Sequence, residues 1–249
     1  MIASFHLSSI DWGILIVCSF LIGMAKVGVP GVSMVVIPAL AMIFGGKQST
    51  GIILPMLIMA DIFGVSYYHR HAHWKHVLRA LPWALSGIMI AMFVGNRVSD
   101  KQFKQIIAAV IFASIAFMIW RDRSKNASYL PSKWYFAAAM GLGGGFATMI
   151  GNAAGPILAI YLLALRLPKN EFIGTAAWFF FVINLMKFPL HVISWKTINW
   201  GTLLIDIATL PSIAIGAFIG IWLVKKISGE WYRWLVIGVT ILSAVIMLF

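Results

Sequence analysis

The chain has 249 residues, of which 61% are hydrophobic and only 10% are charged. A soluble domain of this length is roughly a quarter charged and cannot hide so much apolar surface from water, so the composition excludes a soluble globular protein. The formal net charge of +12 would suit a nucleic-acid binder, but most Lys and Arg residues lie in short loops between apolar runs. That placement argues against nucleic acid as a partner and favours topological signals flanking a lipid bilayer.

Residues 1–125 contain apolar runs at about 10–28, 31–44, 51–68, 77–97 and 103–120. A helix that crosses a bilayer needs about 20 residues, so the second run is too short to cross alone. A Gly/Pro break separates it from the first run, at Gly28-Val29-Pro30-Gly31. We therefore expect a broken or re-entrant helix hairpin over 10–44, followed by three transmembrane helices. The first run lacks a basic leader and a cleavage site, so we interpret it as a retained membrane segment rather than a signal peptide.

Residues 126–249 repeat this order, with runs at about 134–150, 153–165, 172–190, 202–224 and 232–248. The second of these runs is again short and follows a break at Gly151-Asn152-Ala153-Ala154-Gly155-Pro156, so we expect a second hairpin over 134–165. Landmarks recur in the same order in both halves. Gly51 and Asp61 match Gly174 and Asn184, and the set Pro82, Gly87 and Ser99 matches Pro211, Gly216 and Ser228. The pattern predicts a duplicated unit.

The basic residues indicate how the two units are oriented. If each hairpin enters and leaves on one side, one side collects twelve basic residues: Arg70, Lys75, Arg79, Arg121, Arg123, Lys125, Lys133, Arg166, Lys169, Lys225, Lys226 and Arg233. The other side has five: Lys47, Arg97, Lys101, Lys104 and Lys196. This asymmetry satisfies the positive-inside rule. We therefore predict an all-α integral membrane protein, built as an inverted repeat, with both termini on the outer side.

The two breaks are the first candidates for a binding site. Interrupted membrane helices leave backbone N–H groups that suit an anion, and paired breaks mark the substrate site of many secondary transporters. The candidate residues at the breaks are Gly28, Val29, Pro30, Gly31, Ser33, Thr148, Asn152, Ala153 and Gly155. The alternative is that these small residues serve only close helix packing.

Ionisable residues inside the apolar runs are the second group of candidates, because each is costly in lipid. Lys26 lies beside the first break, and Lys187 lies on one helical face with Asn184 and His191. Either lysine suits an anionic substrate; the alternative is a side chain that extends to the membrane interface. Asp61 lies in mid-run, where it either pairs with a lysine, carries a coupling proton or caps a broken helix. Asp206 lies near the end of its run and reads as interfacial.

Other side chains give no sign of a metal site or an enzyme. The segment His69–His76 is rich in histidine, but its basic residues repel a divalent ion and no carboxylate lies nearby in the sequence, so we interpret it as a solvated loop. Cys18 is the single cysteine, which excludes an intrachain disulfide. The sequence contains no motif of a hydrolase, metalloprotease or P-loop ATPase, and no cofactor is implied.

Several motifs resemble the sulfite exporter TauE/SafE family. In the first half these are Gly28–Gly31, Ile37–Leu40, Lys47–Gly51 and His73–Lys75; in the second half they are Gly151–Pro156, Pro168-Lys169, Gly174-Thr175 and Asn184. The resemblance covers almost the whole chain. It implies a bacterial inner-membrane exporter of sulfite, of sulfonates such as sulfoacetate, or of related anions.

One motif departs from the family, because Lys26 stands among the small residues of Gly23–Pro30. The identity of the anion therefore stays open. A proton-coupled or cation carrier centred on Asp61 and a membrane protein without transport activity remain as alternatives. The sequence also leaves open whether the chain forms a homodimer.

Overall fold

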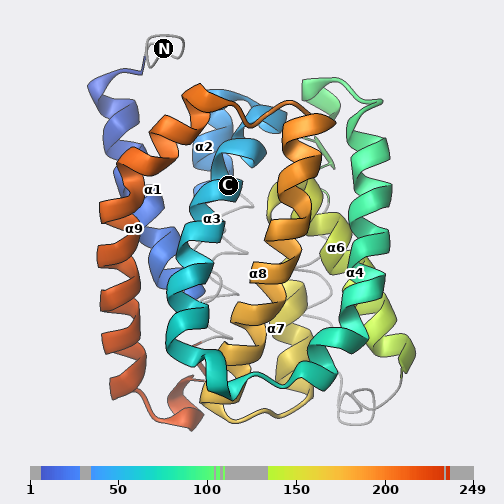
Figure 1. Ribbon diagram of the computed structural model, residues 1–249, viewed down its shortest axis with the longest axis vertical. Helices are drawn as coiled ribbons and strands as arrows, with labels where there is room; N and C mark the ends of the chain where they lie inside the picture. Colours follow the sequence, from blue (N-terminus) through green and yellow to red (C-terminus); the bar gives the residue numbers. More distant parts are fainter. Residues whose placement is uncertain are drawn as a thin grey trace.

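A computed structural model describes residues 7–28, 35–103, 105–106, 109, 134–232 and 234–235. In the described part, helices follow one another without an intervening strand (Figure 1). Their bounds are α1 Ser9–Lys26, α2 Val36–Phe44, α3 Gly46–Tyr68, the short 3-10 helix η3 His69–His71, α4 Trp74–Gly95, α6 Trp134–Gly151, α7 Gly155–Ala164, α8 Lys169–Ile193 and α9 Trp200–Lys226. The predicted all-α fold is confirmed for these residues.

Five helices are long and apolar enough to cross a bilayer: α1, α3 with η3, α4, α8 and α9. The polypeptide is therefore a multi-pass membrane protein. The short helices α2 and α7 have 9 and 10 residues, which gives each a length of only about 15 Å at 1.5 Å per residue. Neither can cross alone, as their short apolar runs predicted. The predicted helices at 103–120 and 232–248 lie almost wholly outside the described residues.

The long helices begin one to five residues before the apolar runs that predicted them. Helix α3 begins at Gly46 rather than 51, and α9 begins at Trp200 rather than 202. The added first turns are polar, and a hydropathy pattern does not detect them. In α9 the Asn199 side chain accepts a hydrogen bond from the backbone N–H of Thr202, which fixes the start of the helix.

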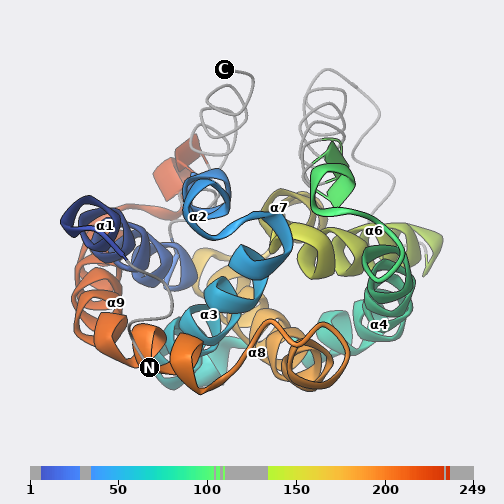
Figure 2. The same cartoon turned by 90° about the horizontal axis from the view of Figure 1, so that it is seen from above.

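The helices form two flanking pairs around a central pair. Seen from above, α1 and α9 lie on one flank, α4 and α6 on the other, and α3 and α8 between them (Figure 2). Each flank therefore joins a helix from the first half of the chain to a helix from the second half. The α3–α4 turn and the start of α8 lie at the lower end in Figure 1, and the start of α3 lies at the upper end.

Glycines set the distance between the two helices of each flank. A Cβ atom at Gly145 of α6 would lie 1.9 Å from the Ala84 carbonyl oxygen of α4. On the other flank, a Cβ at Gly216 of α9 would lie 2.1 Å from the Phe20 carbonyl oxygen of α1. Small residues that allow such backbone contact are a usual basis of helix association in lipid.

Replacing Gly145 by alanine is expected to destabilise the protein, because the added methyl group meets backbone that cannot move aside. Overpacking of this kind costs about 1–3 kcal/mol. Gly143 is the matched control: it lies on the same helix with nothing within 4 Å of its Cβ position, so Gly143→Ala is expected to be neutral or stabilising. Thermal unfolding of both variants in detergent micelles measures the difference. Equal midpoints would show that the flank is not tightly packed at Gly145.

Candidate functional site

A small cavity lies where the two helix breaks face the central helices. Its volume is about 60 Å³, which is room for a few water molecules or a small oxyanion. Much of its wall is apolar, from Leu57, Phe172, Ile173, Ala176 and Phe180. Its polar side chains are Lys26, Thr148, Asn152, Asn184 and Tyr232. The cavity thus combines an apolar wall with a few polar groups, as small-molecule sites usually do.

Backbone conformations that few residues tolerate create the two breaks. After α1 ends, Gly28 has a φ of 129°, a conformation that side chains rarely permit. After α6 ends, Asn152 has a φ of 54°, in the left-handed region that asparagine adopts more readily than most residues. Helix α7 then begins at Gly155 with a proline in its first turn and no side-chain cap. Its uncapped N-terminus carries a partial positive charge at the cavity wall.

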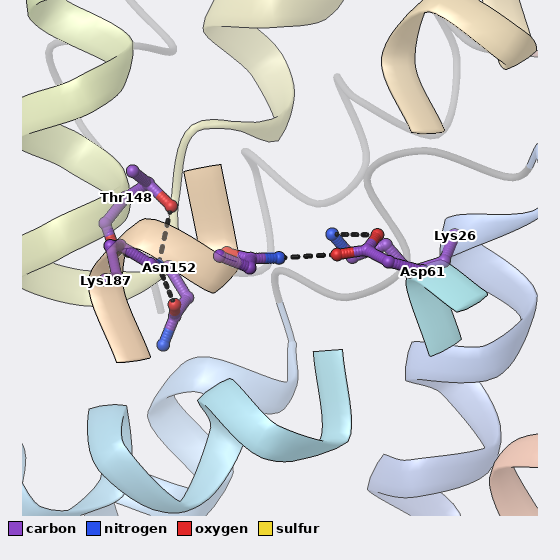
Figure 3. Close-up of polar contacts among 6 residues, drawn as sticks. Lys26, Asp61, Thr148, Asn152 and Lys187 are labelled. Carbon is purple, nitrogen blue, oxygen red and sulfur yellow. Dashed lines mark hydrogen bonds and ion pairs between the residues drawn. The ribbon is translucent and has the colours of Figure 1, made fainter. Parts of the chain in front are cut away.

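One set of polar contacts links α1, α3 and α8 (Figure 3). The Lys26 ammonium forms an ion pair with Asp61 Oδ1 at 2.9 Å, and Asn184 Nδ2 donates to Asp61 Oδ2 at 2.6 Å. Lys26 Nζ also lies 4.1 Å from the centre of the Phe180 ring, a cation–π contact. Asp61 is fully buried, so this pairing satisfies a carboxylate that lipid or apolar protein would not tolerate alone.

A second set of contacts joins α8 to the break between α6 and α7. Lys187 Nζ donates to the carbonyl oxygen of Thr148 and to its hydroxyl, both at 2.9 Å, and to Asn152 Oδ1 at 2.6 Å (Figure 3). The Asn152 amide in turn donates to the Thr50 carbonyl at 3.1 Å. Lys187 is fully buried, yet every one of these acceptors is neutral. The contacts hold the break in place and put the Lys187 amino group next to it.

The structure brings together most of the residues that the sequence singled out. Six line the cavity: Lys26, Gly28, Thr148, Asn152, Gly155 and Asn184. Asp61 and Lys187 contact lining residues directly, whereas Ala153 is buried without lining the cavity. The remaining candidates, Val29, Pro30, Gly31 and Ser33, lie outside the described residues.

The burial and contacts of the charged residues decide part of the alternatives for them. Lys187 is fully buried and the Lys26 side chain is only 10% exposed, so neither extends to the membrane interface. Pairing with a lysine, the favoured reading of Asp61, is confirmed. His191 shares the buried face of α8 as predicted, but its ring contacts Thr197 at 2.9 Å and not the cavity.

The sequence missed one contact and gave one wrong reading. The missed contact joins the histidine segment to a carboxylate, because the His73 Nε2 atom forms a hydrogen bond with Glu171 in the first turn of α8. A sequence separation of about 100 residues hid this contact. Asp206 is not exposed at the interface but fully buried, and neither of its carboxylate oxygens has a hydrogen-bond partner among the described residues.

The sequence also missed three aromatic residues of the cavity: Phe172, Phe180 and Tyr232. Aromatic side chains are frequent throughout the apolar runs, so nothing distinguished these three. The nearest signal is that Phe172 and Phe180 share a face of α8 with each other and lie two to four turns before Lys187.

Comparison with known proteins identifies the family of this chain. Residues 15–247 match the family described as sulfite exporter TauE/SafE. The chain belongs to the TauE/SafE family. No curated protein and no solved structure matched the chain in the corresponding searches. Membership in TauE/SafE confirms the resemblance and identifies a membrane transporter family, whose members are described as sulfite exporters.

Proposed function

We propose that the protein exports small anions from the cytoplasm through the cavity between its two helix breaks. The supporting observation is a charge imbalance: among the described residues at the cavity, two buried ammonium groups, of Lys26 and Lys187, accompany a single carboxylate, of Asp61. An uncompensated buried cation is costly and attracts an anion. Sulfite is the substrate that the family's description names, and sulfonates such as sulfoacetate are further candidates proposed from the sequence.

We propose further that the chain is an inverted repeat of residues 1–125 and 126–249. Two lysines support this reading, because each donates a hydrogen bond to a backbone carbonyl at the corresponding place in its own half. Lys47, at the start of α3, donates to the Gly95 carbonyl at the end of α4, at 2.9 Å. Lys169, at the start of α8, donates to the Ile227 carbonyl just after α9, at 2.6 Å. In Figure 1 the start of α3 and the end of α4 lie at the upper end, whereas the start of α8 and the end of α9 lie at the lower end, as an inverted relation requires.

The proposed direction of transport follows from charge and membrane potential. The end with more Lys and Arg faces the cytoplasm under the positive-inside rule, which places both termini on the periplasmic side of a bacterial inner membrane. An anion leaving a negative interior moves downhill by about 2.3 kcal/mol per charge for each 100 mV. Export therefore needs no ATP and no coupling ion.

Flux measured in proteoliposomes tests the function. Vesicles loaded with sulfite or sulfoacetate and given an inside-negative potential are expected to release the anion at least about tenfold faster than protein-free vesicles. Reversing the potential should slow the release, because the driving force changes sign. Absence of flux, together with no anion-dependent rise of the unfolding midpoint, would overturn the proposal.

A second candidate is a proton-coupled carrier centred on Asp61. The observation in its favour is that Asp61 is fully buried in the middle of α3 and bridges two residues of the cavity, Lys26 and Asn184. A carboxyl group at such a position is suited to carry a proton across the membrane. It predicts that flux depends on a pH gradient and requires the Asp61 carboxyl group.

A further inference from the structure

The polar groups at the cavity present both free donors and one free acceptor. The Lys26 ammonium uses one N–H for Asp61, one face meets the Phe180 ring, and donor capacity remains. The Thr148 hydroxyl accepts from Lys187, so its own hydrogen points elsewhere, and no acceptor for it lies among the described residues. The Tyr232 hydroxyl is buried and likewise has no described partner. These three donors suit an anion.

The free acceptor is the side-chain carbonyl of Asn184. Asp61 accepts hydrogen bonds only, so the 2.6 Å contact between these residues requires the Asn184 amide nitrogen to face Asp61. The carbonyl oxygen Oδ1 must then point away from Asp61. It is buried and has no hydrogen-bond partner among the described residues. Asp61 thus orients Asn184, a residue of the cavity lining, so that its buried carbonyl oxygen is left without a partner among the described residues.

A simple anion leaves this acceptor unsatisfied. Sulfate, nitrate or a fully ionised sulfite offers only acceptors, so its binding would bury Asn184 Oδ1 without a donor and add repulsion between oxygen lone pairs. A buried polar group without a partner is costly, and sites built to bond a substrate hydroxyl discriminate against analogues that lack it. The donor must therefore come from the ligand itself.

The charge of the cavity limits the ligand in a second way. One carboxylate offsets one of the two buried ammonium groups, which leaves a single positive charge for the ligand to neutralise. A monoanion matches that charge, whereas a dianion carries an excess negative charge into a largely apolar cavity.

We propose, on the basis of the proposed anion site, that the cavity selects monoanions that carry a hydrogen-bond donor, and that Asn184 Oδ1 is the group that recognises this donor. Hydrogen sulfite meets both conditions, whereas the sulfite dianion and sulfoacetate, which is a dianion without a donor, meet neither. The proposal therefore narrows the candidate substrates to donor-bearing monoanions. Hydroxylated organic monoanions meet them as well. Asn184 is thus a specificity-determining residue, positioned by Asp61.

Matched pairs of monoanions test this selectivity. Glycolate and acetate differ by a hydroxyl group, and hydrogencarbonate and nitrate are planar monoanions that differ by one O–H. The purified full-length protein is expected to bind the donor-bearing member of each pair about tenfold more tightly, as measured by the anion concentration that raises the unfolding midpoint. Sulfate, a dianion without a donor, is expected to bind more weakly than either glycolate or hydrogencarbonate.

Two variants assign the discrimination to its source. Asn184→Leu removes the acceptor, so the ratio within each pair is expected to fall to about one. Tyr232→Phe removes a donor, so it is expected to weaken both members of a pair while the ratio stays. If Asn184→Leu does not fold, the ratios of the unaltered protein still decide the selectivity.

The outcomes separate this proposal from the proposed function. Equal binding of glycolate and acetate, and of hydrogencarbonate and nitrate, would overturn the donor requirement while leaving the anion site intact. A preserved ratio in Asn184→Leu would overturn the role of that residue. Binding of no anion at all would overturn the anion site itself, and with it both proposals.

Discussion

Replacing Lys187 by methionine is expected to reduce anion flux about a hundredfold while the protein remains folded. Methionine has a similar length and no charge, so it fits the apolar surroundings of α8. An anion roughly 6 Å from a unit charge gains about 3 kcal/mol at an effective dielectric constant of about 20, which corresponds to a factor of about 100 in affinity. The variant also frees Asn152 from the contact of 2.6 Å that holds the break. Concentration-dependent flux in proteoliposomes measures the loss.

Lys47→Met provides the matched control for this experiment. Lys47 is also a lysine of a membrane helix, but it donates to the Gly95 carbonyl at 2.9 Å and does not line the cavity. Its loss removes a helix C-terminal contact and is expected to lower the unfolding midpoint with little change in anion affinity. If Lys187→Met also showed lower stability and normal anion affinity, Lys187 would only stabilise the backbone between α6 and α7 and would not be the cation of the site.

The sequence predicts the positions of the helices wherever hydrophobicity or the backbone properties of glycine and proline alone determine them. Apolar length identified the helices α3, α4, α8 and α9, and the two Gly/Pro breaks identified where shorter helices begin. The first turns were missed because they are polar and lie outside the apolar runs. At α9 a cap contact between Asn199 and Thr202 fixes the boundary, and it acts between side chain and backbone rather than through hydropathy.

The site was predictable only to the extent that its residues are unusual for a membrane. Lys26, Asp61 and Lys187 stand out because charge is rare inside apolar runs. Their partners depend on which helices pack together, so the sequence allowed Asp61 to pair with either lysine, and the structure selects Lys26. Tyr232 did not stand out, because an aromatic residue in an apolar run usually faces lipid or core.

Burial inside the protein is a further property that hydropathy does not encode. Asp206 and Lys187 both lie towards the ends of their apolar runs, where a charged residue usually reaches the interface. Both are fully buried, because neighbouring helices cover them. Lys187 donates to three acceptors, whereas neither carboxylate oxygen of Asp206 has a donor among the described residues.

Replacing Asp61 by asparagine is expected to strengthen anion binding and to destabilise the empty protein. The substitution removes the carboxylate that lies 2.9 Å from the Lys26 ammonium, so a buried cation loses its partner. Breaking a buried ion pair in this way costs about 3–5 kcal/mol. A bound anion then replaces the lost carboxylate, so the rise of the unfolding midpoint with added anion is expected to be larger in Asp61→Asn than in the unaltered protein.

The double variant Lys26→Met/Asp61→Asn isolates this interaction. Because it removes both charges, it is expected to recover most of the stability lost in Asp61→Asn, and to lose the enhanced anion response as well. The same variants decide between the two candidate functions. An anion exporter driven by membrane potential retains flux in Asp61→Asn and does not respond to a pH gradient. A carrier that moves protons through Asp61 loses all flux in that variant, and this result would replace potential-driven export by proton coupling.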